Sequence, residues 1–198
     1  MQSSTTHGKV QRMTGIAILT AIIVVVQIIC TFIHFGPFSI TLALAPIIIG
    51  AAVYGVGTGA LLGGVFGLVV LITGILGWDG GTVMFLMGMN PVATVLICIV
   101  KGAAAGLAAG AVYAAIAKKN QLVGVITAGV VCPVVNTGLF VAGMLTFFFS
   151  TISGWAAGND SMVQYIIFGL CGGNFLVELA TNLLLATAIT RIIRVVRK

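Results

Sequence analysis

The stretch PVATVLICIVKGAAAGLAAGAVYAAIAKKNQL, residues 91–122, decides the fold class of this chain. One charged residue, Lys101, lies inside its apolar part, which ends at Lys118 and Lys119. A helix needs roughly 20 apolar residues to cross a hydrocarbon core about 30 Å thick. The stretch is therefore predicted to be a membrane-spanning helix that is followed by a basic turn.

The composition of the whole chain agrees with this stretch. Of its 198 residues, 60% are hydrophobic and only 6% are charged, whereas soluble domains carry roughly a quarter charged residues. The formal net charge is +6, but the basic residues flank apolar runs and form no stripe with interleaved aromatic residues, as nucleic-acid binding would require. The sequence predicts an integral membrane protein whose partners include the lipid bilayer and no nucleic acid.

Polar and Gly/Pro positions divide the chain into six apolar runs. They predict an all-α membrane protein with six transmembrane helices, near Met13 to Ile33, Phe38 to Tyr54, Gly57 to Leu76, Pro91 to Ala117, Leu122 to Ser150 and Met162 to Val195. Between the second and third runs, a tight turn and a single bent hairpin are both compatible with the glycines. The first run is too long for the core of a signal peptide. We expect tails at 1–12 and 196–198 around one transmembrane domain, residues 13–195.

Basic residues predict which side the termini face. Eight of the nine Lys and Arg residues lie in the head, in the turn after the fourth run, or in the tail: Lys9, Arg12, Lys118, Lys119, Arg191, Arg194, Arg197 and Lys198. Loops rich in Lys and Arg stay in the cytoplasm. The connections at 34–37, 77–90 and 151–161, which would lie on the opposite side, contain neither residue. Both termini are therefore expected to be cytoplasmic, which requires an even number of spans.

Two glycine series recur every fourth residue. One comprises positions 55, 59, 63 and 67, and the other comprises positions 102, 106 and 110. Small residues at this spacing let another helix backbone approach closely. Tight packing within the chain is the expected role of both series. Ala17 and Ala21 form a shorter pair of the same kind, which can pack internally or dock a partner helix.

Charged and amide side chains inside the apolar runs are candidate binding groups. Lys101 falls near mid-membrane, where a lipid-facing ammonium costs about 3 kcal/mol, so it should face the interior. Glu178 lies at a comparable depth, and it either neutralises Lys101 or joins it in contacting a ligand. Three series of polar side chains add candidates: Asn174, Glu178 and Asn182; Gln27, Thr31 and His34; and Asn136 with Thr137. Each can bond a neighbouring helix, but together they favour a ligand cavity.

The outward connections carry a second group of polar and aromatic residues. They are Trp78, Asp79, Asn90, Trp155, Asn159 and Asp160. Tryptophan at a membrane boundary is commonly an interfacial anchor. Alternatively, Trp78 and Trp155 close over a flat ring-containing ligand that Asn90 helps to orient.

Several catalytic and metal-binding motifs do not occur in the sequence. It contains no G-x-x-x-x-G-K-[ST] and no H-E-x-x-H, and it has only two histidines, His7 and His34. The four cysteines, Cys30, Cys98, Cys132 and Cys171, lack the short spacings of a zinc site. We therefore expect no enzyme activity, no metal and no cofactor, and any uphill transport would need energy from elsewhere.

Local patterns resemble one transporter family. The segments FSITLALAPIIIGA (38–51) and GALLGGVFG (59–67) resemble the second and third helices of vitamin-binding S components of energy-coupling factor (ECF) transporters. Lys101-Gly102, PVVNTG (133–138) and the residues from Asn174 to Asn182 are similar to later segments of that family. The resemblance covers nearly the whole chain, although its motifs are loose and rich in glycine.

The resemblance implies a function and a set of partners. It implies a water-soluble vitamin bound with high affinity near the outer half, and a bacterial plasma-membrane location. It also implies docking, through Ala17 and Ala21, onto a membrane scaffold subunit that carries two ATPases. Lys101 weakly favours a carboxylate-bearing vitamin of the pantothenate or folate kind. Two other interpretations stay open: a stand-alone secondary transporter in which Lys101 and Glu178 couple proton movement to a solute, and a structural or assembly protein without a small ligand.

Overall fold

A bundle of long apolar helices makes up most of the protein. The computed structural model describes residues 3–35, 38–39, 41–157 and 161–196; for residues 3–7, 34–35, 38–39, 169–171 and 174 it describes the backbone only. Five described helices are long and apolar enough to cross a membrane: α1 (Ser3–Thr31), α3 (Val56–Ile75), α5 (Pro91–Ile116), α6 (Gln121–Phe147) and α9 (Gly173–Val196). They confirm a helical membrane fold.

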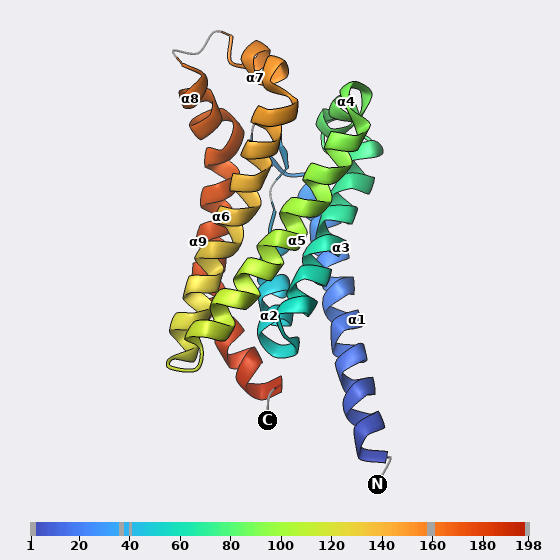
Figure 1. Ribbon diagram of the computed structural model, residues 1–198, viewed down its shortest axis with the longest axis vertical. Helices are drawn as coiled ribbons and strands as arrows, with labels where there is room; N and C mark the ends of the chain where they lie inside the picture. The colour runs from blue at the N-terminus through green and yellow to red at the C-terminus, as the bar shows by residue number, and fades with distance from the viewer. Residues whose placement is uncertain (1–2, 36–37, 40, 158–160, 197–198) are drawn as a thin grey trace.

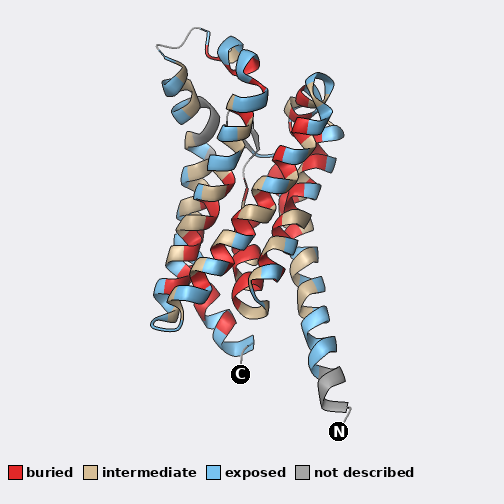
Figure 2. Cartoon of the chain, in the orientation of Figure 1, coloured by how far each residue is buried: buried red, intermediate tan, exposed pale blue. Residues whose placement is uncertain are grey.

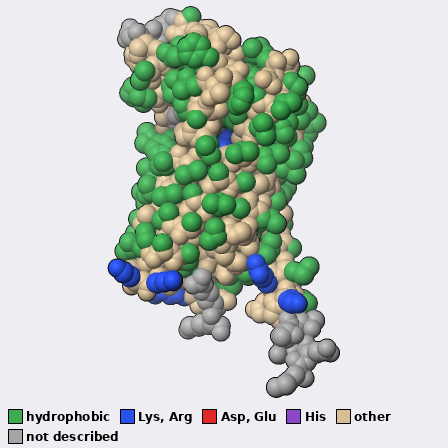
Figure 3. Space-filling view, in the orientation of Figure 1, with side chains coloured by type: hydrophobic (Ala, Val, Ile, Leu, Met, Phe, Trp, Pro, Cys, Tyr) green, Lys and Arg blue, Asp and Glu red, His purple; other side chains and the backbone are tan. Residues whose placement is uncertain are grey.

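Basic residues gather at one end of the bundle. Figure 1 places both marked chain ends at the lower end, together with the turn that joins α5 to α6. The Lys and Arg side chains visible in Figure 3 also gather mainly at this lower end. We call it the basic end, and we call the opposite end, which carries the shorter helices α4 (Thr82–Met89) and α7 (Phe149–Trp155), the distal end. The sequence correctly predicted that the termini and the Lys118–Lys119 turn lie together.

Helices α3 and α5 pack through the two glycine series, with almost no space between their backbones. A Cβ atom on Gly59 would lie 2.5 Å from the carbonyl oxygen of Gly106, and one on Gly63 would lie 2.7 Å from the carbonyl carbon of Gly102. Real Cβ atoms do not approach other atoms so closely. The prediction that both series serve tight packing within the chain is therefore confirmed except at Gly55, which precedes α3 and would have nothing within 4 Å of an added Cβ.

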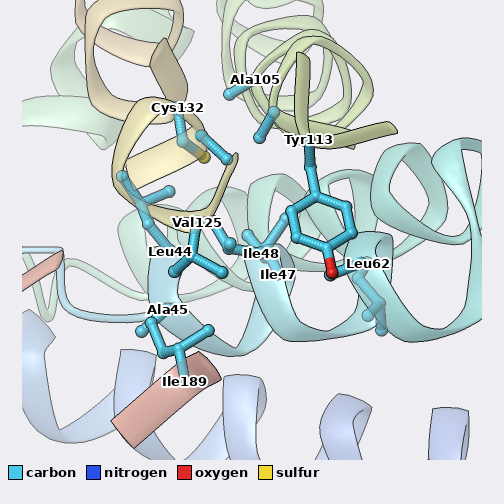
Figure 4. Close-up of a cluster of buried hydrophobic side chains, with 14 of the residues drawn as sticks. Leu44, Ala45, Ile47, Ile48, Leu62, Ala105, Tyr113, Val125, Cys132 and Ile189 are labelled. Atoms are coloured by element: carbon cyan, nitrogen blue, oxygen red, sulfur yellow. The ribbon is translucent and has the colours of Figure 1, made fainter. Parts of the chain in front are cut away.

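The apolar core lies in the half of the bundle nearer the basic end. Ile47 and Ile48 of α2 (Leu44–Tyr54) are fully buried there against Leu62, Ala105 and Ile189, which come from α3, α5 and α9. Figure 4 shows these side chains converging, and Figure 2 shows that much of α1 near its N-terminus is exposed. Helix α2 is thus wrapped by other helices and faces little lipid.

The second expected span is shorter than predicted. Instead of a helix from Phe38, the structure has a small antiparallel pair, β1 (His34–Phe35) with β2 (Phe38–Ser39), and then α2 beginning only at Leu44. Eleven residues rise about 16 Å, which is half of a hydrocarbon core. Residues 41, 43, 44 and 45 are buried in the protein, and non-helical backbone at membrane depth is tolerated under that condition.

Other boundaries also differ from the predicted runs. Helix α1 begins at Ser3 and so includes most of the expected tail; Arg12 there donates through Nη2 to the carbonyl oxygen of Tyr54 at 3.3 Å. The fifth run breaks at Phe148, where α7 begins a separate helix. The sixth starts at Met162 as predicted, but α8 (Met162–Gln164) and a π-helical segment η1 (Tyr165–Gly172) precede α9.

Candidate functional site

A group of buried polar side chains occupies the bundle interior. Its members come from α1, the segment before α2, α6 and α9, and each is at most 7% exposed: Gln27, Thr31, Thr41, Asn136, Glu178 and Asn182. Burying a polar group without a partner costs roughly 1–3 kcal/mol in proteins. The partners of each side chain therefore distinguish packing roles from open binding groups.

Glu178 is the centre of this group and is 3% exposed. The side chains of Thr41 and Asn136 interact with its carboxylate, and Lys101 acts on it electrostatically. Its Oε2 atom nevertheless has no hydrogen-bond partner in the described structure, and neither does Oδ1 of Asn136. Two buried oxygen atoms on interacting side chains thus lack hydrogen-bond donors.

Lys101 lies on α5 and is only partly buried. Its Nζ atom sits 5.0 Å from the centroid of the Phe140 ring of α6, a cation–π contact. Among the described residues it makes no ion pair, so the direct Lys101–Glu178 pair that the sequence allowed is not formed. The ammonium thus faces the protein and interacts with Glu178 without closing on it.

Asn182 has a different role from Asn136. Its Nδ2 donates to the carbonyl oxygen of Gly129 at 3.3 Å and so joins α9 to α6. Asn182 and Glu178 both face the interior, which agrees with the predicted polar face of the last helix. The side chain of Asn174, the third member of that face, lies outside the described residues.

Of the polar series Gln27, Thr31 and His34, the structure describes the side chains of the first two. Gln27 is 1% exposed, and its Oε1 has no hydrogen-bond partner among the described residues. Thr31 donates to the backbone oxygen of Gln27 at 2.8 Å. The neighbouring thiol of Cys30 faces the backbone of Leu42, so this part of α1 borders the segment that carries Thr41. The side chain of His34 lies outside the described residues.

The predicted residues of the outward connections have identifiable structural roles at the distal end. Asn90 caps α5 by accepting from the backbone nitrogen of Ala93 at 3.1 Å. Asp79 accepts from the nitrogens of Gly81 and Val83 at 3.1 and 3.0 Å and so holds the start of α4. Asn159 and Asp160 lie outside the described residues.

Both tryptophans pack against aromatic rings. Trp78 stacks on Phe32 of α1 with centroids 5.8 Å apart, and Trp155 of α7 lies 6.2 Å from Phe85 of α4. Thr151 of α7 also donates to the sulfur of Met89 at the end of α4, at 3.3 Å. These contacts join α7 to α4 across the distal end of the bundle.

A pocket of about 270 Å³ opens at the basic end, away from the predicted site. Its lining is mostly alanine and glycine and includes none of the predicted site residues: Ala51, Ala52, Gly55, Val56, Tyr113, Ala114, Ala117 and Lys118. Glu178 and Asn136, the candidate binding groups with unpartnered oxygens, do not line this pocket.

Ala17 and Ala21 are exposed on α1. Large apolar side chains of the same helix surround them on the surface, including Ile18, which is 56% exposed, and Val25, which is 55% exposed. The pair is therefore not used to pack α1 against the rest of the described bundle. A flat apolar face with two small residues is open on this helix.

Thr41, a member of the polar group, and Phe140, which lies against Lys101, were not predicted as site residues. Thr41 was placed inside the second span, yet a hydroxyl in an apolar run just before a proline-containing helix start is a usable signal. Phe140 carries no such signal, because one aromatic residue among many in an apolar helix does not reveal that it faces Lys101.

Comparison with known proteins identifies the family. A family model described as "ECF transporter, substrate-specific component" matches residues 11–193. No curated protein is similar enough in sequence to match the chain. Because the matched region covers nearly the whole chain and most or all of each of the five described helices that could cross a membrane, this protein belongs to the family of substrate-specific components of ECF transporters.

Proposed function

We propose that this chain captures a water-soluble vitamin or a related micronutrient outside the cell and delivers it inward together with a transmembrane scaffold subunit and two ATPases. The family match supports the transport role. The sequence has no phosphate-binding loop of its own, so the energy for uphill transport would come from those partners.

The observation that carries a binding role is the pair of open acceptors at Glu178 and Asn136. Both side chains are at least 96% buried, and a purely structural polar group would be expected to have its hydrogen bonds filled. Lys101 supplies a positive charge to the same site. We therefore assign the ligand to the interior between α5, α6 and α9, with Asn174 and Gln27 as further candidates.

The topology is part of this proposal. The basic end faces the cytoplasm, because loops rich in Lys and Arg are retained on that side. The short helix α2, with the buried residues just before it, contributes the sixth crossing. The distal end, with Trp78, Asn90 and Trp155, then faces the outside of a bacterial plasma membrane, and His34 lies towards it.

Binding is testable with the purified chain. The compound that it retains, identified by mass spectrometry after denaturation, should quench or shift tryptophan fluorescence when it is added back to stripped protein, because Trp155 packs against α4 at the distal end, which faces the outside in this proposal. Trp155→Phe should remove most of that signal and keep the affinity within about threefold. A chain that retains and binds no small molecule would refute the proposed function.

A further inference from the structure

We infer that the transported molecule is dipolar: it presents N–H donors of an amine, amidine or amino-heterocycle to Glu178 and Asn136, and an acceptor such as a carboxylate or carbonyl to Lys101. This inference rests on the proposed function and specifies the chemistry of its ligand. It changes the expectation drawn from the sequence, in which Lys101 alone favoured a carboxylate.

The first step concerns the two open oxygens. Glu178 Oε2 and Asn136 Oδ1 are buried and lack hydrogen-bond partners among the described residues. An amide oxygen and the oxygens of an ionised carboxylate are acceptors, so with Glu178 ionised a donor satisfies both. Because the two side chains interact with each other, one group with several N–H bonds is suited to reach both oxygens.

The orientation of the Asn136 amide supports this assignment. A carboxylate such as that of Glu178 only accepts, so the favourable arrangement turns Nδ2 of Asn136 towards Glu178 and leaves Oδ1 open. Thr41 interacts with the same carboxylate through its hydroxyl. Neither Thr41 nor Asn136 fills Oε2, so a donor from outside the described residues is needed to satisfy this atom.

The second step concerns Lys101. Its ammonium lies over the Phe140 ring and has no carboxylate or carbonyl acceptor among the described residues. An ammonium has three N–H donors. A ring face attracts its charge but does not accept a hydrogen bond as strongly as an oxygen atom does. An acceptor on the bound molecule completes this side of the site.

The two halves together exclude simpler ligands. An anion held by Lys101 alone would leave two buried acceptors open and would add negative charge near Glu178. A cation held by Glu178 alone would leave the ammonium without an acceptor and would add positive charge near it. Leaving a buried polar group unpaired is costly, so a site of this kind selects a molecule that serves both ends.

The test compares what the variants retain. Full-length wild-type chain, Glu178→Gln and Lys101→Met are purified in mild detergent without stripping, and the small molecules that they release on denaturation are identified and quantified. Asn182→Ala is the matched control, because Asn182 lies one turn from Glu178 and is equally buried but bonds Gly129. Size-exclusion profiles and thermal melting report whether each variant is folded.

We expect the wild-type protein and Asn182→Ala to release the same compound, with an amino or amidine N–H group and a separate acceptor group. Glu178→Gln and Lys101→Met should each reduce the retained amount or affinity roughly 10- to 100-fold, the effect of losing one charged hydrogen bond. Should Glu178→Gln not fold, Asn136→Leu removes the other open acceptor without a change of charge and should show the same loss.

A released compound without an N–H donor would overturn the inference and leave the proposed function intact. Unchanged retention by the folded variants would also overturn it. No compound from wild-type protein would instead contradict the proposed function, so the two failures are distinguishable.

Discussion

Replacing Gly63 by valine is expected to prevent the chain from folding into a stable bundle. Overpacked cores typically lose 1–3 kcal/mol, but those cores relax by moving side chains. At Gly63 the added Cβ would meet backbone, 2.7 Å from the carbonyl carbon of Gly102 and 3.2 Å from Cα of Ala103, so α3 and α5 would have to separate. We expect a loss of more than about 3 kcal/mol, measured by thermal melting and monodispersity in detergent.

The neighbouring glycine provides a matched control. A Cβ on Gly64 would have nothing within 4 Å, and a helix interior prefers most residues to glycine by up to about 1 kcal/mol. Gly64→Val should therefore melt within a few degrees of the wild-type protein. Equal melting temperatures for Gly63→Val and Gly64→Val would show that the close backbone contact between α3 and α5 does not stabilise the bundle.

Replacing both Ala17 and Ala21 by leucine is expected to block transport while sparing ligand binding. The two residues are exposed on α1, and small residues at this spacing let a partner helix approach closely. Two leucines would hold that helix away, and we expect uptake with the scaffold and ATPases to fall at least tenfold. Vesicle uptake and binding by the purified variant measure the two effects separately.

Helix α5 offers the control for this experiment. Ala111 and Ala115 have the same spacing and are also exposed, so Ala111→Leu with Ala115→Leu adds equal bulk elsewhere on the surface. This control should transport at the wild-type rate. Normal uptake by the α1 variant would show that Ala17 and Ala21 do not form the docking face.

Much of the fold follows from short-range sequence features. The lengths of the apolar runs predict the five long helices. Glycine at every fourth residue predicts where α3 and α5 meet, and the basic residues predict which ends of the helices lie together. Each of these depends on residues within one segment or on a single physical rule. For example, once Gly59 and Gly106 are both assigned to helices, their lack of side chains predicts that the two backbones can approach closely there.

The second span shows where such reasoning fails. Residues 38–43 are nearly as apolar as α2, and hydropathy alone does not show where in such a run a helix begins. Pro46 was the available signal, because proline is tolerated in the first turn of a helix, and α2 does begin two residues before it. The break at Phe148 and the π-helical segment depend on packing between distant helices and leave no local pattern.

The candidate site was predicted in part for the same reason. Spacing alone placed Glu178 and Asn182 on one face of α9, and the structure agrees. Spacing did not show that the Asn182 amide donates a hydrogen bond to the carbonyl oxygen of Gly129, or that Oδ1 of Asn136 has no hydrogen-bond partner among the described residues. Which of several buried amides is free depends on contacts between helices that no single segment specifies.

The separation of Lys101 from Glu178 bears on the alternative of a stand-alone proton-coupled transporter. Intramembrane ionisable residues mark proton relays as well as ligand sites, and the two functions place different demands on energy. In a proton-coupled carrier the chain alone would suffice. Under the proposed function, the open groups would serve a ligand and the ATPases would supply the energy.

The most direct measurement is uptake of the co-purified compound into proteoliposomes, with the chain alone under a proton gradient or with scaffold, ATPases and ATP. We expect the chain alone to bind the compound but not to accumulate it, and the complete assembly to accumulate it only with ATP. Accumulation by the chain alone, driven by the proton gradient, would contradict the account.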